Sequence, residues 1–197
     1  GGIESDGQGN LMTTAACQLS PNRNPTMSRA EIIERLKKDF GAENVVWLEN
    51  GALAGDDTDS HIDTLARFAP ANTIVYTCSN DPADEHYYTL QAMKKELMLA
   101  KDKNGHGFNL MELPLPSPIF DQEGQRLPAT YSNYLVLPDV VLMPTYRQPQ
   151  NDLLAKKILE SVYERAVECV DCTALINQHG SLHCATMQIP EGALSFC

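Results

Sequence analysis

The sequence lacks any long apolar run, because none of its 197 residues lies in a stretch of about 18 or more apolar residues. Its first residues form neither a basic stretch nor the apolar core of a secretory leader. We therefore expect neither a membrane span nor a signal peptide, and we expect a cytoplasmic protein.

Basic residues are also scarce. The chain has 15 Lys and Arg against 26 Asp and Glu, which gives a formal net charge of -11. A surface of this sign repels a phosphate backbone, so we expect no nucleic-acid partner. It attracts a small cation instead, and the sequence leaves a homo-oligomer open.

Cysteines are too few for a disulfide framework, with six in 197 residues, and we expect reduced thiols. The hydrophobic share of 43% suffices for one sizeable core. The chain begins at Gly1 without a Met, and turn-rich residues 1–7 precede a strand expected at 10–14. We expect a part of a longer protein.

Hydrophobic spacing predicts a repeated order of elements. Residues 28–31 read Ser-Arg-Ala-Glu, a capping box, and apolar residues at helical spacing follow up to Gly41, a typical helix end. Further helices are expected at residues 81–100 and 152–168, and strands at 44–48, 62–68, 73–78, 108–113, 131–137, 140–143 and 173–176. The recurring order strand, strand, helix, strand predicts an α/β fold built from one repeated module rather than a doubly wound sheet.

An acidic loop at residues 55–63 surrounds one histidine with four carboxylates. If residues 61–63 are extended, the side chains of His61 and Asp63 point to the same face, because strand side chains alternate. A solvated acidic loop or a calcium site is the alternative, although the spacing is not that of an EF-hand loop.

Cys184 is the second candidate for chemistry. It lies among small and polar residues without helical period. A thiolate is a strong nucleophile once a nearby cation lowers its pKa from about 8.5, but a lone cysteine is more often a buried inert thiol. The residues around Cys184 do not decide between the two.

A rival interpretation uses Cys169 and Cys172 with His179 and His183, as a non-catalytic zinc site or a redox pair. Only six residues separate the two halves, against about 12 to 15 in a zinc finger, and the cysteines follow the end of an expected helix, where thiolates are not stabilised. Residues 22–25 (Asn-Arg-Asn-Pro) are expected to be a structural turn, and Arg67 a buried ion-pair partner without a catalytic role.

Four segments occur together in a characteristic order: Gly-Ile-Glu-Ser-Asp-Gly (2–7), Pro-Asn-Arg-Asn-Pro (21–25), Gly-Asp-Asp-Thr-Asp-Ser-His-Ile-Asp-Thr-Leu-Ala-Arg-Phe (55–68) and His-Gly-Ser-Leu-His-Cys-Ala-Thr-Met-Gln (179–188). They resemble the agmatine deiminase family, relatives of the bacterial peptidylarginine deiminases. The resemblance implies the pentein fold, an α/β propeller of five such modules, of which about three would be present. Residues 1–197 would be the C-terminal portion of one catalytic domain, and two upstream modules would supply a further Asp and Glu.

The resemblance also implies roles. Cys184 matches the nucleophile, His61 the general acid and base, Asp63 a carboxylate that grips the guanidinium, and Asp57 a substrate-binding position, with no cofactor. The implied reaction converts agmatine into N-carbamoylputrescine and ammonia, in putrescine and polyamine biosynthesis, through a covalent amidino-cysteine. The alternative substrate is peptidyl-arginine, which would become citrulline. Residues 178–182 and the pair Asp59 and Ser60 depart from the common agmatine deiminase pattern.

Overall fold

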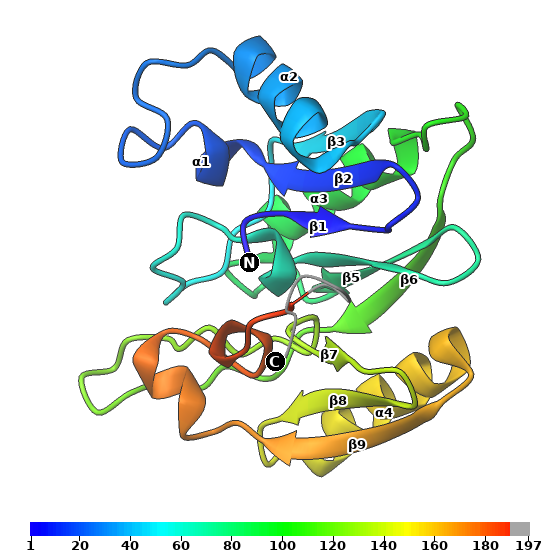
Figure 1. Cartoon of the computed structure of the whole chain (residues 1–197). Coiled ribbons are helices and arrows are strands. Elements are labelled where there is room, and N and C mark those ends of the chain that lie inside the picture. Colours follow the sequence, from blue (N-terminus) through cyan, green and yellow to red (C-terminus); the bar gives the residue numbers. More distant parts are fainter. Residues whose placement is uncertain (190–197) are drawn as a thin grey trace, which may run out of the picture.

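The computed structural model describes residues 1–189, and within them the chain forms three modules of one design (Figure 1). In each module the first two strands are antiparallel and the last two are parallel. A helix joins the two parallel strands, which need a crossover connection. The predicted α/β architecture of repeated strand-strand-helix-strand units is confirmed.

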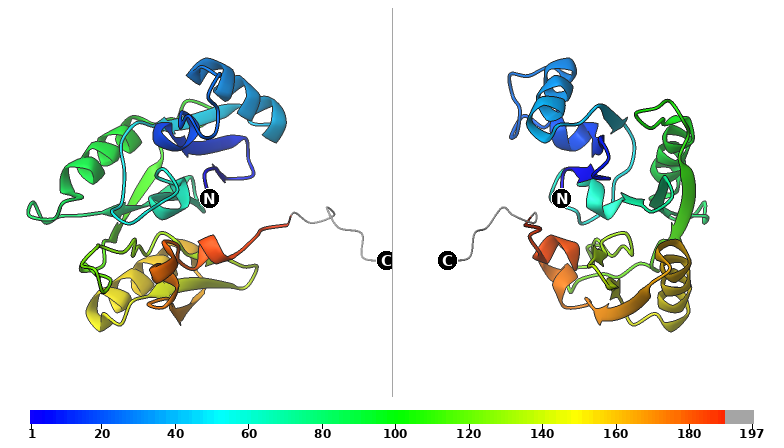
Figure 2. Two further views of the ribbon diagram at one scale, coloured as in Figure 1. Left: turned by 90° about the vertical axis from the view of Figure 1, so that its left-hand side faces the viewer. Right: turned by 45° about the vertical axis from the view of Figure 1, so that its right-hand side comes forward.

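Each module contains three strands and one long helix, and module one has an additional short helix. Module one contains β1 (Glu4–Ser5), β2 (Asn10–Thr14), the short α1 (Ala15–Gln18), α2 (Arg29–Phe40) and β3 (Asn44–Leu48). Module two contains β4 (Ala66–Ala69), β5 (Thr73–Cys78), α3 (Tyr87–Leu99) and β6 (Asn109–Pro114). Module three contains β7 (Leu135–Val136), β8 (Val140–Thr145), α4 (Pro149–Tyr163) and β9 (Ala166–Asp171). Figure 2 shows the three long helices on the outer side of the molecule and the N-terminus on its inner side.

The sequence signals at the two ends of α2 predicted its position correctly. The Ser28 side chain accepts the Glu31 N–H, and the Glu31 carboxylate accepts the Ser28 N–H at 2.8 Å, so both halves of the capping box are present. Gly41 ends the helix in the left-handed region, at φ 65°, which glycine adopts without a steric penalty. The strands at residues 10–14, 44–48 and 73–78 also have their predicted bounds.

Several other predicted bounds were wrong. Residues 62–64 form a 3-10 turn, so that strand begins only at Ala66. The helix expected from residue 81 begins at Tyr87, because the side chains of Asp81 and Asp84 bind nearby backbone N–H groups and favour turns. The strand expected at 131–137 is reduced to β7, since residues 131–134 form a buried connection.

The last helix and strand were also misplaced. Pro149 opens α4, as its fixed φ allows at a first helical position, and Glu164 ends it in the left-handed region at φ 51°. Residues 166–171 are therefore strand β9 rather than helix, and the strand expected at 173–176 does not form. Cys169 lies on β9 and not at a helix end.

The modules share their hydrophobic cores. Met12, Val46 and Leu48 of module one pack into the cluster of module two, while Val75 and Leu113 of module two pack into the cluster of module three. Burial of such apolar side chains favours folding by about 25 cal/mol per Å². The modules therefore stabilise one another.

Arg67 joins all three modules through polar contacts. Its Nε lies 3.0 Å from Glu4 Oε1 of module one, and its Nη1 donates to Tyr134 O at 2.7 Å, in the segment leading into module three. The guanidinium also lies over the Tyr134 ring, 5.0 Å from its centroid. Burial alone would lower the pKa of Arg67, but the Glu4 carboxylate raises it, so the guanidinium is charged. The expectation of a buried ion pair is confirmed.

We expect Arg67→Met to lower the free energy of unfolding by about 3–5 kcal/mol, because it leaves the largely shielded Glu4 carboxylate without its counter-charge. The matched control is Arg165→Met, which changes an exposed arginine and should alter stability by less than about 0.5 kcal/mol. Urea unfolding followed by circular dichroism measures both. Equal midpoints for Arg67→Met and the unchanged protein would contradict this account.

Candidate active site

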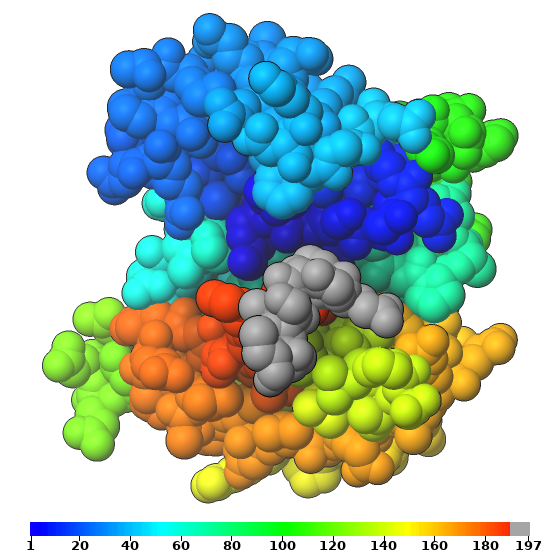
Figure 3. All heavy atoms as spheres, in the orientation of Figure 1, coloured from blue at the N-terminus to red at the C-terminus, as the bar shows by residue number. Residues whose placement is uncertain are grey.

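The four residues predicted for the site line one cavity of about 450 Å³. Asp57, His61 and Asp63 line it from the acidic loop, and His183 and Cys184 line it from the C-terminal segment. Gly1 also lines it. Figure 3 shows the deep blue N-terminal residues beside the red segment near the end of the described chain. The structure thus brings residues about 120 positions apart to one place.

The acidic loop is held by hydrogen bonds to its backbone, most of them from its own side chains. Asp56 accepts the N–H groups of Thr58 at 3.0 Å and Ser60 at 2.9 Å, and the Thr14 hydroxyl donates to Ser60 O at 2.7 Å. Asp59 and Ser60 both lie in the left-handed region, at φ 62°. This strained turn directs His61 into the cavity, while Asp57 stays exposed at its rim.

His61 and Asp63 face the same space, but not for the reason predicted. Residues 62–64 form a 3-10 turn, so alternation along a strand does not apply. The two side chains meet beside Gly1, where an added Cβ would lie 2.5 Å from His61 Nδ1 and 2.8 Å from Asp63 Oδ1. The Asp63 N–H also donates to Gly1 O at 3.3 Å. Only glycine allows so close an approach of the backbone.

Asp63 is a buried carboxylate with one oxygen in use. Its residue is 1% exposed, and Oδ2 accepts a hydrogen bond from His183 Nδ1 at 2.7 Å. Burial would raise the pKa of Asp63, but the hydrogen bond from His183, with the Arg67 charge further away, holds it below the ordinary value. Oδ1 has no hydrogen-bond partner in the described part of the chain.

His183 connects Asp63 to Arg67. The Arg67 Nη2 lies 3.4 Å from His183 Nε2, and a guanidinium can only donate. His183 Nε2 is therefore the acceptor, and the proton on Nδ1 points to Asp63. Sequence reasoning used His183 only as a zinc ligand and missed this role, although it directly precedes Cys184.

Cys184 lies in the 3-10 turn His183–Ala185. Its Sγ is 3.9 Å from Asp63 Oδ2 and 3.3 Å from Asn133 Nδ2. Shielding from water raises the pKa of the thiol, and the Asp63 carboxylate raises it further. The unliganded site therefore favours a protonated thiol.

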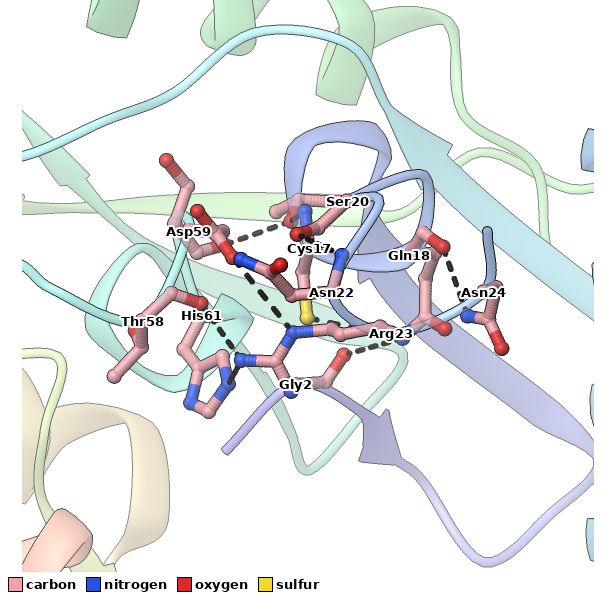
Figure 4. A network of polar contacts seen from close by, with 12 residues as sticks. Gly2, Cys17, Gln18, Ser20, Asn22, Arg23, Asn24, Thr58, Asp59 and His61 are labelled. Atoms are coloured by element: carbon pink, nitrogen blue, oxygen red, sulfur yellow. Dashed lines mark hydrogen bonds and ion pairs between the residues drawn. The ribbon is translucent and has the colours of Figure 1, made fainter. Parts of the chain in front are cut away.

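Arg23 contacts His61, which sequence reasoning did not anticipate (Figure 4). Its Nη2 lies 3.0 Å from His61 Nε2 and donates to Thr58 O, also at 3.0 Å, while its Nε is 3.9 Å from an Asp59 oxygen. Because arginine only donates, His61 Nε2 is the acceptor and the imidazole is neutral. Burial lowers the pKa of His61, and the Arg23 charge contributes to the shift. The Asn-Arg-Asn-Pro motif was the available signal.

His86 holds the start of the acidic loop. The Ala54 N–H donates to His86 Nε2 at 2.8 Å, while Nδ1 lies 2.9 Å from Asp84 Oδ1. Arg126 in turn contacts Asp84 at 2.9 Å and Glu85 at 3.0 Å. Burial lowers the pKa of His86, followed by the effect of Arg126, so His86 is a neutral acceptor. The loop thus has a histidine anchor outside the cavity.

The proposed zinc ligands are not gathered into one site. Cys172 is buried, Cys169 is exposed on β9, and the ring of His179 contacts Gly55 O at 2.8 Å. Across residues 1–189, no group of three or more His, Cys, Asp or Glu side chains is placed to hold a metal ion. The structure gives the zinc interpretation no support.

Comparison with known proteins agrees with this geometry. The sequence profile of the Porphyromonas-type peptidyl-arginine deiminases matches residues 1–190. The chain belongs to this family. A Vibrio parahaemolyticus protein provisionally named agmatine deiminase is 33% identical over 207 residues, which cover 96% of this chain and 57% of that protein. The chain therefore spans just over half the length of such peptidyl-arginine deiminase-family relatives.

Two solved structures of family members resemble the chain closely. A crystal structure provisionally named peptidyl-arginine deiminase has a TM-score of 0.94 and 48% identity, covering 98% of this chain and 57% of that one. A variant of C. jejuni agmatine deiminase with substrate bound has a TM-score of 0.84 and 40% identity, covering 93% and 53%. An amidinotransferase from Microseira wollei, at 15% identity and TM-score 0.55, shares the fold alone. The fold is that of the penteins.

We expect Arg23→Met to remove the contact that fixes the tautomer of His61. Without the donor to Nε2, the imidazole should populate both neutral tautomers, and its pKa should rise toward the ordinary value because the site is better hydrated and has lost a positive charge. Long-range ¹H–¹⁵N NMR of the histidine rings across pH measures both changes. Arg29→Met, at the start of α2, is the matched control. An unchanged His61 spectrum would contradict the contact.

We expect stability to fall with acid through His86. Its folded pKa lies below the unfolded value, so its contribution is present above about pH 6.5 and is lost as the pH falls through the lowered folded value. His86→Gln retains an acceptor for Ala54 but does not titrate. Between about pH 6.5 and pH 5, its free energy of unfolding should decline less steeply than that of the unchanged protein. Parallel declines in urea-unfolding series would exclude this role.

Proposed function

We propose that this chain carries the nucleophile and the general acid and base of a guanidine-deiminating enzyme, with agmatine as the substrate. The observation that supports this most is the free oxygen of Asp63. A buried carboxylate with an unpartnered Oδ1 is unfavourable unless a donor or cation completes it. Asp63 also lines a cavity that contains a thiol and a neutral imidazole.

A guanidinium fits this vacancy by charge and shape. It is planar and permanently charged, and it offers N–H groups that pair with carboxylate oxygens. Bound at Asp63 Oδ1, its carbon lies near Cys184, because Cys184 Sγ is 3.9 Å from the other oxygen of the same carboxylate. The exposed Asp57 at the rim adds a second negative charge. The cavity volume, about 450 Å³, is in the range of small-ligand sites.

The same cation activates the thiol. In the free site, shielding from water and the Asp63 charge keep Cys184 protonated. A bound guanidinium offsets the Asp63 charge and so favours the thiolate. Once Arg23 releases His61 Nε2, neutral His61 takes the thiol proton at that atom, and the thiolate attacks the guanidine carbon to form a C–S bond. The nucleophile is thus formed when the substrate is in place.

Protons then pass through His61. The imidazolium gives its proton to the departing nitrogen, the C–N bond breaks, and ammonia leaves a covalent amidino-cysteine. Water enters, His61 takes one of its protons, and the oxygen attacks the same carbon. The C–S bond breaks as the oxygen loses its second proton, which ends on the released ammonia as ammonium. The neutral ureido product leaves, and His61 returns its proton to Cys184. The cycle balances without a further reactant.

Agmatine is favoured over peptidyl-arginine by the names of several relatives, among them the C. jejuni and Pseudomonas fluorescens agmatine deiminases. The products would be N-carbamoylputrescine and ammonia. The family name and the 48% identical structure favour peptidyl-arginine as the second candidate. The reaction is the same for both substrates. Peptidyl-arginine requires a more open mouth of the cavity than agmatine does.

The relatives are longer than this chain, so the proposed site includes residues that lie outside these 197. The three modules are proposed to be the C-terminal portion of one pentein catalytic domain, in which further residues contribute to the guanidine site. No helix within residues 1–189 is long and apolar enough to cross a membrane. A cytoplasmic enzyme that forms homo-oligomers remains compatible with these findings.

Cys184→Ala should lower ammonia release from agmatine at least about 1,000-fold, because it removes the thiol that forms the covalent intermediate. The polypeptide that contains these residues is assayed with agmatine, arginine and a peptidyl-arginine, and the ureido product is identified by mass spectrometry. Cys169→Ser is the matched control, since this exposed thiol on β9 lies outside the cavity, and its activity should be unchanged.

The outcomes separate the candidates. Turnover of agmatine that disappears in Cys184→Ala supports the proposal. Turnover of peptidyl-arginine alone would instead identify peptidyl-arginine as the substrate. Ammonia release that survives Cys184→Ala refutes the role of Cys184.

A further inference from the structure

His179 contacts the acidic loop from the segment that precedes Cys184. Its ring Nδ1 lies 2.8 Å from Gly55 O, although the two residues are 124 positions apart. A backbone carbonyl only accepts, so Nδ1 carries a proton and the ring donates this hydrogen bond. His179 also lines the cavity, together with Asp57 of the loop and with Cys184. The bond thus joins two walls of the candidate site.

The backbone of His179 adopts a conformation that most residue types avoid. The residue ends the 3-10 turn Leu175–Gln178 in the left-handed region, at φ 63°. Glycine adopts this region without a steric penalty, whereas the Cβ of a histidine meets one. A histidine is favourable here only if its side chain makes contacts that offset the backbone cost. The hydrogen bond to Gly55 O is such a contact.

Gly55 is also packed against the chain between modules two and three. A Cβ added to Gly55 would overlap the backbone oxygen of Arg126 and lie 3.0 Å from the Pro128 ring. Its φ of 81° is a further reason for glycine at this position. The start of the acidic loop is therefore packed against residues 126–128 and hydrogen-bonded to the ring of His179.

Asp57 lies between two anchored carbonyl groups. Gly55 O, two residues before it, accepts from His179, and Thr58 O, directly after it, accepts from Arg23 at 3.0 Å. The Asp57 side chain itself is exposed at the rim of the cavity. Its position therefore depends on how firmly the loop backbone is held on either side.

The segment that carries His179 is fixed independently of the loop. Gly180 packs closely on Cys184, since an added Cβ would lie 3.1 Å from Cys184 Cβ. Ser181 is 3% exposed, and its hydroxyl lies 2.8 Å from the Tyr146 hydroxyl. His179 therefore attaches the acidic loop to a wall of the cavity that other contacts hold in place.

We propose that His179 is a positioning residue for substrate binding, whose hydrogen bond to Gly55 O holds the Asp57 carboxylate at the rim, where it attracts the far, positively charged end of the substrate. This rests on the proposed function, in which the guanidinium binds at Asp63. Agmatine carries a second positive charge, the ammonium at the other end of its carbon chain. A carboxylate held in place loses less conformational entropy on binding this charge than a mobile one does.

Hydrogen–deuterium exchange tests the anchor without requiring turnover. His179→Gly removes the ring and suits the left-handed backbone, so the variant should fold, which urea unfolding verifies. Amide exchange in residues 55–60 should become at least about fivefold faster, because the loop loses its donor at Gly55 O. His179→Asn should restore slow exchange, since Asn tolerates the left-handed region and its Nδ2, like Nδ1 of histidine, is attached to Cγ.

The matched control is Glu164→Gly. It removes a side chain from another residue in the left-handed region, at φ 51°, at the exposed end of α4 and outside the cavity. Exchange in residues 55–60 should stay at the unchanged rate, and so should the steady-state constants.

Steady-state kinetics tests the effect on the substrate. Agmatine is compared with butylguanidine, which has the same guanidine and carbon chain but no ammonium. In His179→Gly, the KM for agmatine should rise at least about threefold, while that for butylguanidine changes less than about 1.5-fold. The kcat for either should change less than about twofold, because other contacts hold His61, Asp63 and Cys184. General damage to the site would instead affect both guanidines alike.

Unchanged exchange of the loop in the folded His179→Gly protein overturns the anchor, whatever the activity. Faster exchange with equal KM changes for the two guanidines overturns the assignment to the ammonium end of the substrate. If the unchanged protein releases no ammonia from either guanidine, the proposed function fails and the substrate part of this inference fails with it. The exchange result still decides whether His179 holds the loop.

Discussion

The buried guanidinium of Arg67 is the interaction on which the arrangement of the three modules depends. It binds the Glu4 carboxylate of module one and the Tyr134 carbonyl that leads into module three, while its own strand belongs to module two. A charge buried this deeply is tolerated only when all its partners are in place. The relative position of the modules is therefore fixed at the inner side of the molecule, next to the cavity.

The same cation begins a chain of alternating charges that ends in the site. Glu4 is negative and Arg67 positive, His183 follows as a neutral link, and Asp63 is negative again. Two carboxylates thus share one internal guanidinium, and the chain is one positive charge short. Asp63 Oδ1 has no hydrogen-bond partner within residues 1–189, and Asp63 lines the cavity. The guanidinium of the proposed substrate would complete the alternation.

Elements with local signals were predictable from the sequence, and those set by distant contacts were not. The capping box of α2 and the strands β2 and β3 have their signals within a few residues. The pairing of His61 with Asp63 was anticipated, yet the 3-10 turn that produces it was not, because the close packing of Gly1 sets it. Asn133 gives no signal of its own, since nothing near it indicates a contact with a thiol 51 residues later.

The separation along the chain of the residues that meet in the cavity has a consequence for folding. Each sheet is formed mainly from neighbouring segments, whereas Asp63 and His183 are 120 positions apart. Contacts between distant segments carry the larger loop-closure entropy and tend to form late. A molecule with intact secondary structure but undocked modules would keep a cysteine with an ordinary pKa, below the raised pKa of the thiol in the folded, unliganded site. Reactivity at Cys184 would then report completion of the tertiary structure, the last stage of folding.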